Sequence, residues 1–162
     1  MSRKVLLAHT GGTIGMRRGP RGYEPQAGYL AELLSRMPEL ADPSMPEVEL
    51  VEFEPLLDSA DNRPADWLRM AREVAARYDA IDGVVLLHGT DTMAYSASAL
   101  AFLLEGLGKP VVLTGSQVPL AEVRSDAREN LVASLQLAAR ADLHEVCVYF
   151  SGRLLRGCRA TK

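Results

Sequence analysis

The segment GVVLLHGTDT, residues 83–92, joins a continuous apolar run to a turn of small and polar residues. A run such as Gly83–Leu87 is typical of a strand that is covered on both faces. The following residues, 93–107, are apolar nearly all round, which predicts a largely buried helix that ends near Gly106 or Gly108. A buried strand, a polar turn and a buried helix together indicate one unit of a parallel α/β sheet.

The same alternation extends in both directions along the chain. Further strands are expected at residues 5–8, 48–53, 111–113 and 146–150, and further helices at residues 29–36, 64–78 and 127–140. The helix at residues 64–78 places one set of apolar side chains on one face: Trp67, Met70, Ala71, Val74, Ala75 and Tyr78. Residues 15–27, rich in Gly, Pro and Arg, predict a mobile loop or hairpin.

These elements predict an α/β fold with a mainly parallel sheet and helices on both faces. The expected arrangement has three layers, Rossmann-like or flavodoxin-like, with a lid hairpin after the first strand. The 162 residues suit one domain. In sheets of this kind ligands bind beyond the carboxyl ends of the strands, so the strand-to-helix loops are the candidate site.

Composition excludes several classes of protein. With 18 basic and 21 acidic residues and a net charge of −3, the chain has no overall basic excess for nucleic-acid binding. Its longest apolar stretch, residues 94–104, is shorter than the roughly 20 residues that cross a bilayer, and no signal-peptide core precedes it. We therefore expect a cytoplasmic protein without membrane association.

The cysteines and histidines do not form a metal-binding pattern. Cys147 and Cys158 are too few for a disulfide framework, and their spacing to the three scattered histidines matches no zinc motif. We expect no metal, and we expect both cysteines to be small apolar residues in or near a strand.

Three loops that follow apolar runs share glycines and hydroxyl groups: Thr10-Gly11-Gly12-Thr13, His88-Gly89-Thr90-Asp91-Thr92 and Thr114-Gly115-Ser116-Gln117. A fourth polar loop contains Asp58 and Ser59. The glycine spacing fits neither common phosphate-binding pattern. Each loop also has a purely structural explanation, since Thr13 could cap a helical turn and Asp91 or Thr92 could cap the helix at residue 93.

In combination, Thr10-Gly11-Gly12-Thr13-Ile14 and His88-Gly89-Thr90-Asp91-Thr92 resemble the two signature motifs of bacterial-type L-asparaginases, most of all the cytoplasmic type I branch. The resemblance continues through Gly22-Tyr23, Asp58-Ser59, residues 93–100, 108–110 and 114–120, Arg124-Ser125-Asp126, Asn130-Leu131 and Lys162. It covers essentially the whole chain but only the amino-terminal domain of the family. Residues 1–162 are thus expected to be that catalytic domain, without the smaller carboxyl-terminal domain, and to be part of a longer protein.

The resemblance implies hydrolysis of L-asparagine to L-aspartate and ammonia without a cofactor. By resemblance Thr13 is the nucleophile, assisted by Tyr23 on the lid. Thr90, Asp91 and Lys162 correspond to a second catalytic group, and the substrate-binding residues are Asp58, Ser59, Thr90 and Asp91. The backbone N–H groups of Gly12 or Thr90 are candidate oxyanion donors. The residues leave open whether Thr13 forms an acyl-enzyme or an activated water attacks directly.

The resemblance also implies a homo-oligomer, a dimer or tetramer, when full length, with L-asparagine as its small-molecule partner. Two alternatives remain open. One is the asparaginase-like subunit of a tRNA-dependent amidotransferase, against which we note that the signature begins almost at Met1. The other is a fragment that folds or binds but does not turn over, and the isolated domain is expected to be poorly active.

Overall fold

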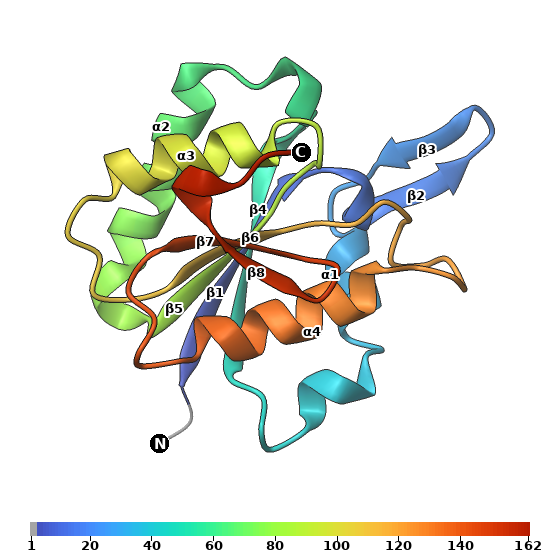
Figure 1. Cartoon of the computed structure of the whole chain (residues 1–162). Coiled ribbons are helices and arrows are strands. Elements are labelled where there is room, and N and C mark those ends of the chain that lie inside the picture. Colours follow the sequence, from blue (N-terminus) through green and yellow to red (C-terminus); the bar gives the residue numbers. More distant parts are fainter. Residues whose placement is uncertain (1–2) are drawn as a thin grey trace.

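The computed structural model describes residues 3–162 and contains one six-stranded sheet with the order β4-β1-β5-β6-β7-β8 (Figure 1). The parallel strands are β1 (Lys4–Gly11), β4 (Glu47–Leu57), β5 (Gly83–Leu87), β6 (Val111–Thr114) and β7 (Val146–Phe150). The edge strand β8 (Arg153–Arg156) runs antiparallel to β7 and was not predicted, because all four of its residues are exposed and carry no burial pattern. The predicted mainly parallel sheet is confirmed.

Helices cover both faces of this sheet, as predicted (Figure 1). The elements α1 (Tyr29–Leu34) and α4 (Ala127–Ala138) pack on one face, and α2 (Pro64–Arg77) and α3 (Met93–Leu103) pack on the other. Successive strand side chains point to opposite faces. In β1, Val5 and Leu7 therefore join the core under α1 and α4, whereas Leu6 and Ala8 join the core under α2 and α3.

Short elements complete the chain. Five 3₁₀ turns are present in the described residues: η1 (Thr13–Gly15), η2 (Pro38–Ala41), η3 (Ser59–Asp61), η4 (Tyr78–Ala80) and η5 (Gly157–Arg159). The hairpin predicted after the first strand is formed by β2 (Met16–Gly19) and β3 (Gly22–Pro25), and it projects away from the sheet (Figure 1).

The strand order places the site. The chain runs from β1 to one neighbour, β4, and then crosses to the other neighbour, β5, from which it continues outward. This is the flavodoxin-like order, in which ligands bind where the direction of winding reverses. The reversal lies between β1 and β5, whose carboxyl ends carry the loops with Thr13 and Thr90.

Three sequence predictions are wrong in detail. Helix α3 ends at Leu103 and has an exposed outer side, where Tyr95 is 67% and Phe102 is 78% exposed, so it is not largely buried. Ala75 is exposed, because the contact of α2 with the sheet is only as wide as Met70, Ala71 and Val74. Cys147 is buried in β7 as expected, but Cys158 lies exposed in η5. No helix in residues 3–162 has the length and apolar character needed to cross a membrane.

Candidate active site

Glycines allow three loops to meet at the carboxyl ends of β1, β4 and β5. Gly12 has a φ of 87°, and a Cβ on it would lie 2.5 Å from the backbone nitrogen of Gly89. A Cβ on Gly89 would in turn collide with the hydroxyl of Ser59 and would lie 3.5 Å from the Cα of Gly12. These contacts are compatible only with glycine at both positions. They bring the loop of Thr13 against the loops of Ser59 and Thr90.

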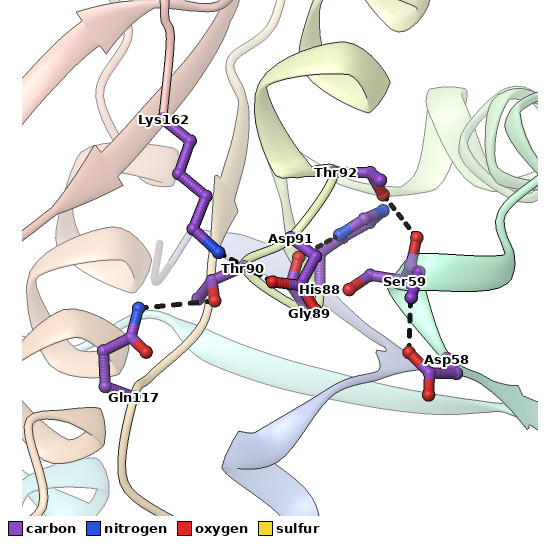
Figure 2. Close-up of polar contacts among 10 residues, drawn as sticks. Asp58, Ser59, His88, Gly89, Thr90, Asp91, Thr92, Gln117 and Lys162 are labelled. Atoms are coloured by element: carbon purple, nitrogen blue, oxygen red, sulfur yellow. Dashed lines mark hydrogen bonds and ion pairs between the residues drawn. The ribbon is translucent and has the colours of Figure 1, made fainter.

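Two further contacts attach distant segments to the loop after β5 (Figure 2). The Lys162 Nζ donates to Oδ1 of Asp91 at 2.7 Å, and the Gln117 side-chain amide donates to the hydroxyl of Thr90 at 3.3 Å. The chain end thereby returns to the polar turn between β5 and α3. Of the residues predicted for the second catalytic group, Asp91 and Lys162 are in direct contact and Thr90 is adjacent in the chain.

Other hydroxyl groups of the same loops have purely structural partners. Thr10 is buried and donates to the carbonyl of Leu87 at 2.8 Å, and Thr114 donates to the carbonyl of Tyr149 at 2.8 Å. Thr92 occupies the N-cap position of α3 without a side-chain cap bond, and instead donates to the carbonyl of Ser59 at 2.7 Å. These bonds hold neighbouring strands and loops together.

The capping explanation does not apply to Thr13. Gly12 is the N-cap residue of η1, and that turn has no side-chain cap bond. Thr13 is half-buried as the first residue of the turn. Its hydroxyl is therefore not needed for capping, unlike those of Thr10 and Thr92, which are engaged with backbone carbonyls.

The two predicted substrate-binding residues of the fourth loop differ in exposure. Asp58 is exposed, and its Oδ1 accepts the backbone N–H of Ala60 at 3.0 Å, which caps η3. Ser59 is buried against Gly89. The Asp58 carboxylate keeps an unused oxygen on the open side of the loop, where it can bind a cationic group.

Tyr23 is the one predicted site residue that stands apart. It lies on β3 of the hairpin and is 44% exposed. Its phenol interacts with the carboxylate of Glu122, which raises the pKa of Tyr23. The hairpin is thus in an open position, with Tyr23 directed toward the loop after β6.

A buried polar chain supports the turn after β5 and was missed in the sequence, where His88 was only one letter of a motif. The indole N–H of Trp67 donates to the hydroxyl of Ser96 at 2.9 Å, and that hydroxyl lies 2.8 Å from Nε2 of His88. The Nδ1 of His88 lies 2.7 Å from the carbonyl of Gly89. Burial lowers the pKa of His88, so the ring is neutral, and this pattern assigns its proton to Nδ1.

The loop that carries Gln117 has its own support. The Asp126 carboxylate accepts the backbone N–H groups of Gln117 and Val118 at 3.0–3.1 Å. Asn130 is buried, and it donates to the carbonyl of Gly115 at 2.9 Å. The sequence analysis did not select these residues, because an Asp followed four residues later by an Asn is ordinary at a helix start.

The site opens into a hollow. A pocket of about 210 Å³ is lined in part by Thr90, Gln117 and Lys162, with Phe150 and Arg153 on its far side. A volume of this size accommodates a ligand no larger than an amino acid. Hydroxyl groups, an ammonium and a carboxylate at its edge provide a nucleophile, proton donors and acceptors for chemistry at a carbonyl group.

Comparison with known proteins agrees with this geometry. The family model "Asparaginase, N-terminal" matches residues 4–162. L-asparaginase 1 of Escherichia coli K12 is 52% identical over 160 residues, which cover 99% of this chain and 47% of that protein. The chain therefore spans about half the length of the relatives it matches.

Solved structures give the same result. The L-asparaginase I of Vibrio cholerae superposes with a TM-score of 0.92 at 48% identity, covering 97% of this chain and 47% of that one. The thermostable L-asparaginase of Thermococcus kodakarensis superposes with a TM-score of 0.81 at 36% identity, covering 95% and 46%.

Proposed function

The chain belongs to the asparaginase family, whose amino-terminal domain it matches, and we propose that it provides the nucleophile-bearing domain of an enzyme that hydrolyses L-asparagine to L-aspartate and ammonia. The observation that carries this proposal is the packing of Gly12 against Gly89, which brings the turn of Thr13 to the turn of Thr90 and Asp91. Both turns lie where the winding of the sheet reverses, the usual ligand position in this fold.

In this proposal Thr13 is the nucleophile. Its Oγ adds to the carboxamide carbon of asparagine, and the carbonyl oxygen becomes an oxyanion. Backbone N–H groups of Gly12 and Thr90 are the proposed donors to this oxyanion, and one such donor contributes about 3–4 kcal/mol to transition-state stability. The amide nitrogen leaves as ammonia after it gains a proton, and water then releases aspartate.

Thr90, Asp91 and Lys162 are proposed to transfer the protons of these steps. Lys162 lies 2.7 Å from Asp91, and Gln117 donates to the Thr90 hydroxyl. Because Thr90 accepts a hydrogen bond from Gln117, its own O–H proton is left to donate toward the pocket. The ion pair holds the ammonium beside that hydroxyl.

Asp58 and Ser59 are proposed to bind the amino-acid end of the substrate. The exposed Asp58 carboxylate suits the α-ammonium group, and Ser59 suits the α-carboxylate. Tyr23 would join the site only after the hairpin moves from its open position, since Tyr23 now interacts with Glu122. Such closure of a lid excludes water from the reacting groups.

We further propose that the full-length protein is a cytoplasmic homo-oligomer. Both cysteines of the chain are unpaired, as is usual in a reducing compartment. The amidotransferase alternative is less well supported, because the relatives reported above bear the name L-asparaginase.

Ammonia release and ligand binding together test the function. The chain is assayed alone and fused to the part of the Escherichia coli relative that follows the matched region, with Thr13→Val as the inactive control. We expect weak release by the chain alone, much stronger release by the fusion and none by either Thr13 variant. L-aspartate should shift the backbone NMR signals of Thr13, Ser59 and Asp91 in the chain alone. A folded fusion that binds L-aspartate but releases no ammonia would favour the non-catalytic alternative.

A further inference from the structure

His9 is a buried histidine whose surroundings the proposed chemistry does not use. It lies on β1, is fully buried, and precedes the loop of Thr13. Its Nδ1 lies 3.1 Å from Oε1 of Glu52 on β4. Since a carboxylate only accepts hydrogen bonds, Nδ1 carries the proton and donates it to Glu52. The other ring nitrogen, Nε2, has no hydrogen-bond partner in the described residues.

The second oxygen of Glu52 binds the far end of the hairpin. Its Oε2 accepts the backbone N–H of Gly28 at 2.8 Å. Gly28 follows β3 and is the N-cap residue of α1, where its φ of 76° fixes the direction of the chain. One carboxylate therefore connects His9 to the segment that leaves the hairpin.

The ring of His9 also supports the near end of the hairpin. Gly15 ends η1 and directly precedes β2. A Cβ on Gly15 would lie 2.5 Å from Cε1 and 2.7 Å from Nε2 of His9, so the ring is packed directly against the Gly15 backbone. The two ends of the hairpin thus rest on one buried pair, while its tip is exposed.

We propose that His9 and Glu52 act as positioning residues that fix both ends of the β2–β3 hairpin and thereby set the path by which Tyr23 approaches Thr13. The inference rests on the proposed function for its catalytic meaning, but the anchoring of the hairpin is a separate physical claim. A hairpin with fixed ends moves as a unit, whereas one with loosened ends samples many positions in which Tyr23 is misplaced.

Trypsin tests the anchoring without reference to activity, because the hairpin contains the exposed residues Arg17, Arg18 and Arg21. Cleavage after these arginines is followed by mass spectrometry under native conditions. Glu52→Ala should increase the cleavage rate at least about fivefold, since local opening controls proteolysis. Glu52→Gln keeps the size of the side chain but weakens both charge-assisted bonds, so an increase of about two- to threefold is expected.

Glu49→Ala and Glu49→Gln are matched controls on the same strand. Glu49 pairs with Lys4 and Arg77, away from the hairpin, so its loss should leave the cleavage rate unchanged. Equal rates for the wild-type protein and Glu52→Gln, or an equal increase in the Glu49 variants, would overturn the anchoring even if Glu52→Ala does not fold.

Ammonia release by the fusion tests the catalytic consequence. Relative to the Glu49 controls, Glu52→Gln should lower kcat at least about threefold with little change in KM, because the closed position rather than binding is impaired. Faster cleavage with an unchanged kcat would overturn the role of the pair in catalysis and retain the anchor. A wild-type fusion without activity would contradict the proposed function, and the trypsin result would still decide the anchor.

Discussion

The ammonium nitrogen of Lys162 lies 2.7 Å from Oδ1 of Asp91, so a residue 71 positions later in the chain completes the turn after β5 (Figure 2). Both side chains are more than half exposed. Exposed ion pairs contribute little to stability, because water solvates the separated charges almost as well. The pair therefore has its main value in placing an ammonium group beside Thr90.

Lys162→Met should separate the catalytic role of this pair from stability. We expect ammonia release by the fusion to fall at least about a hundredfold, while the melting temperature of the chain changes little. Lys4→Met is the matched control, since it removes a similar 2.7 Å pair with Glu49 far from the site. Equal activity of the two variants would remove Lys162 from the proton-transferring group.

Thr13 and Thr10 provide a paired test of which hydroxyl is chemical. Thr13→Val should reduce ammonia release at least about a thousandfold and leave the free energy of unfolding nearly unchanged. Thr10→Val should instead destabilise the chain by about 1–3 kcal/mol, because the buried carbonyl of Leu87 loses its donor. Urea titration and the ammonia assay measure the two effects, and the reverse pattern would contradict the assignment.

Gly89→Ala should damage the site by pushing loops apart. The new Cβ would meet the Ser59 hydroxyl and the backbone of Gly12, so we expect a loss of about 1–3 kcal/mol of stability and weaker L-aspartate binding. Gly108→Ala is the control, because its Cβ would meet only the Tyr78 hydroxyl, at an ordinary 3.5 Å. Unchanged L-aspartate binding by Gly89→Ala would show that the close loop packing is not needed.

The sequence predicted the parallel strands and the hairpin because apolar runs and glycine-rich turns are local signals. It could not rank the threonines, since whether a hydroxyl binds a carbonyl depends on a strand that is distant in sequence. Thr10 and Thr13 look alike in the motif, yet only Thr10 is engaged with Leu87. His9 was missed for the same reason, because Glu52, Gly15 and Gly28 surround it only after folding.

Helix α3 shows a second limit of sequence reasoning. An all-apolar helix predicts burial on every side, but the residue pattern does not say what covers the outer side. In residues 3–162 nothing covers Phe102, which is 78% exposed, whereas Leu100 is fully buried. Apolar periodicity can indicate a helix and still leave its environment undetermined.

These two residues make the difference measurable. Phe102→Asn should change the free energy of unfolding of the chain by less than about 0.5 kcal/mol, because its side chain is already in water. Leu100→Ala should cost about 2–5 kcal/mol through a cavity under α3. Chemical denaturation measures both values. A large loss for Phe102→Asn would mean that the outer side of α3 is covered in solution, for example by a second copy.

The stability of the chain should fall as the pH is lowered below the ordinary histidine range. Burial lowers the pKa of His9 and His88 from 6.5, and for His9 this outweighs the opposite effect of Glu52. Below pH 6.5 the unfolded chain therefore binds protons that the native chain does not, and stability falls by up to about 1.4 kcal/mol per pH unit for each histidine. Urea titrations between about pH 7.5 and 5.5 avoid most carboxylate titration. His88→Gln should reduce this pH slope, whereas the exposed His144→Gln should not, and a slope unaffected by His88→Gln would show that the buried ring is already charged.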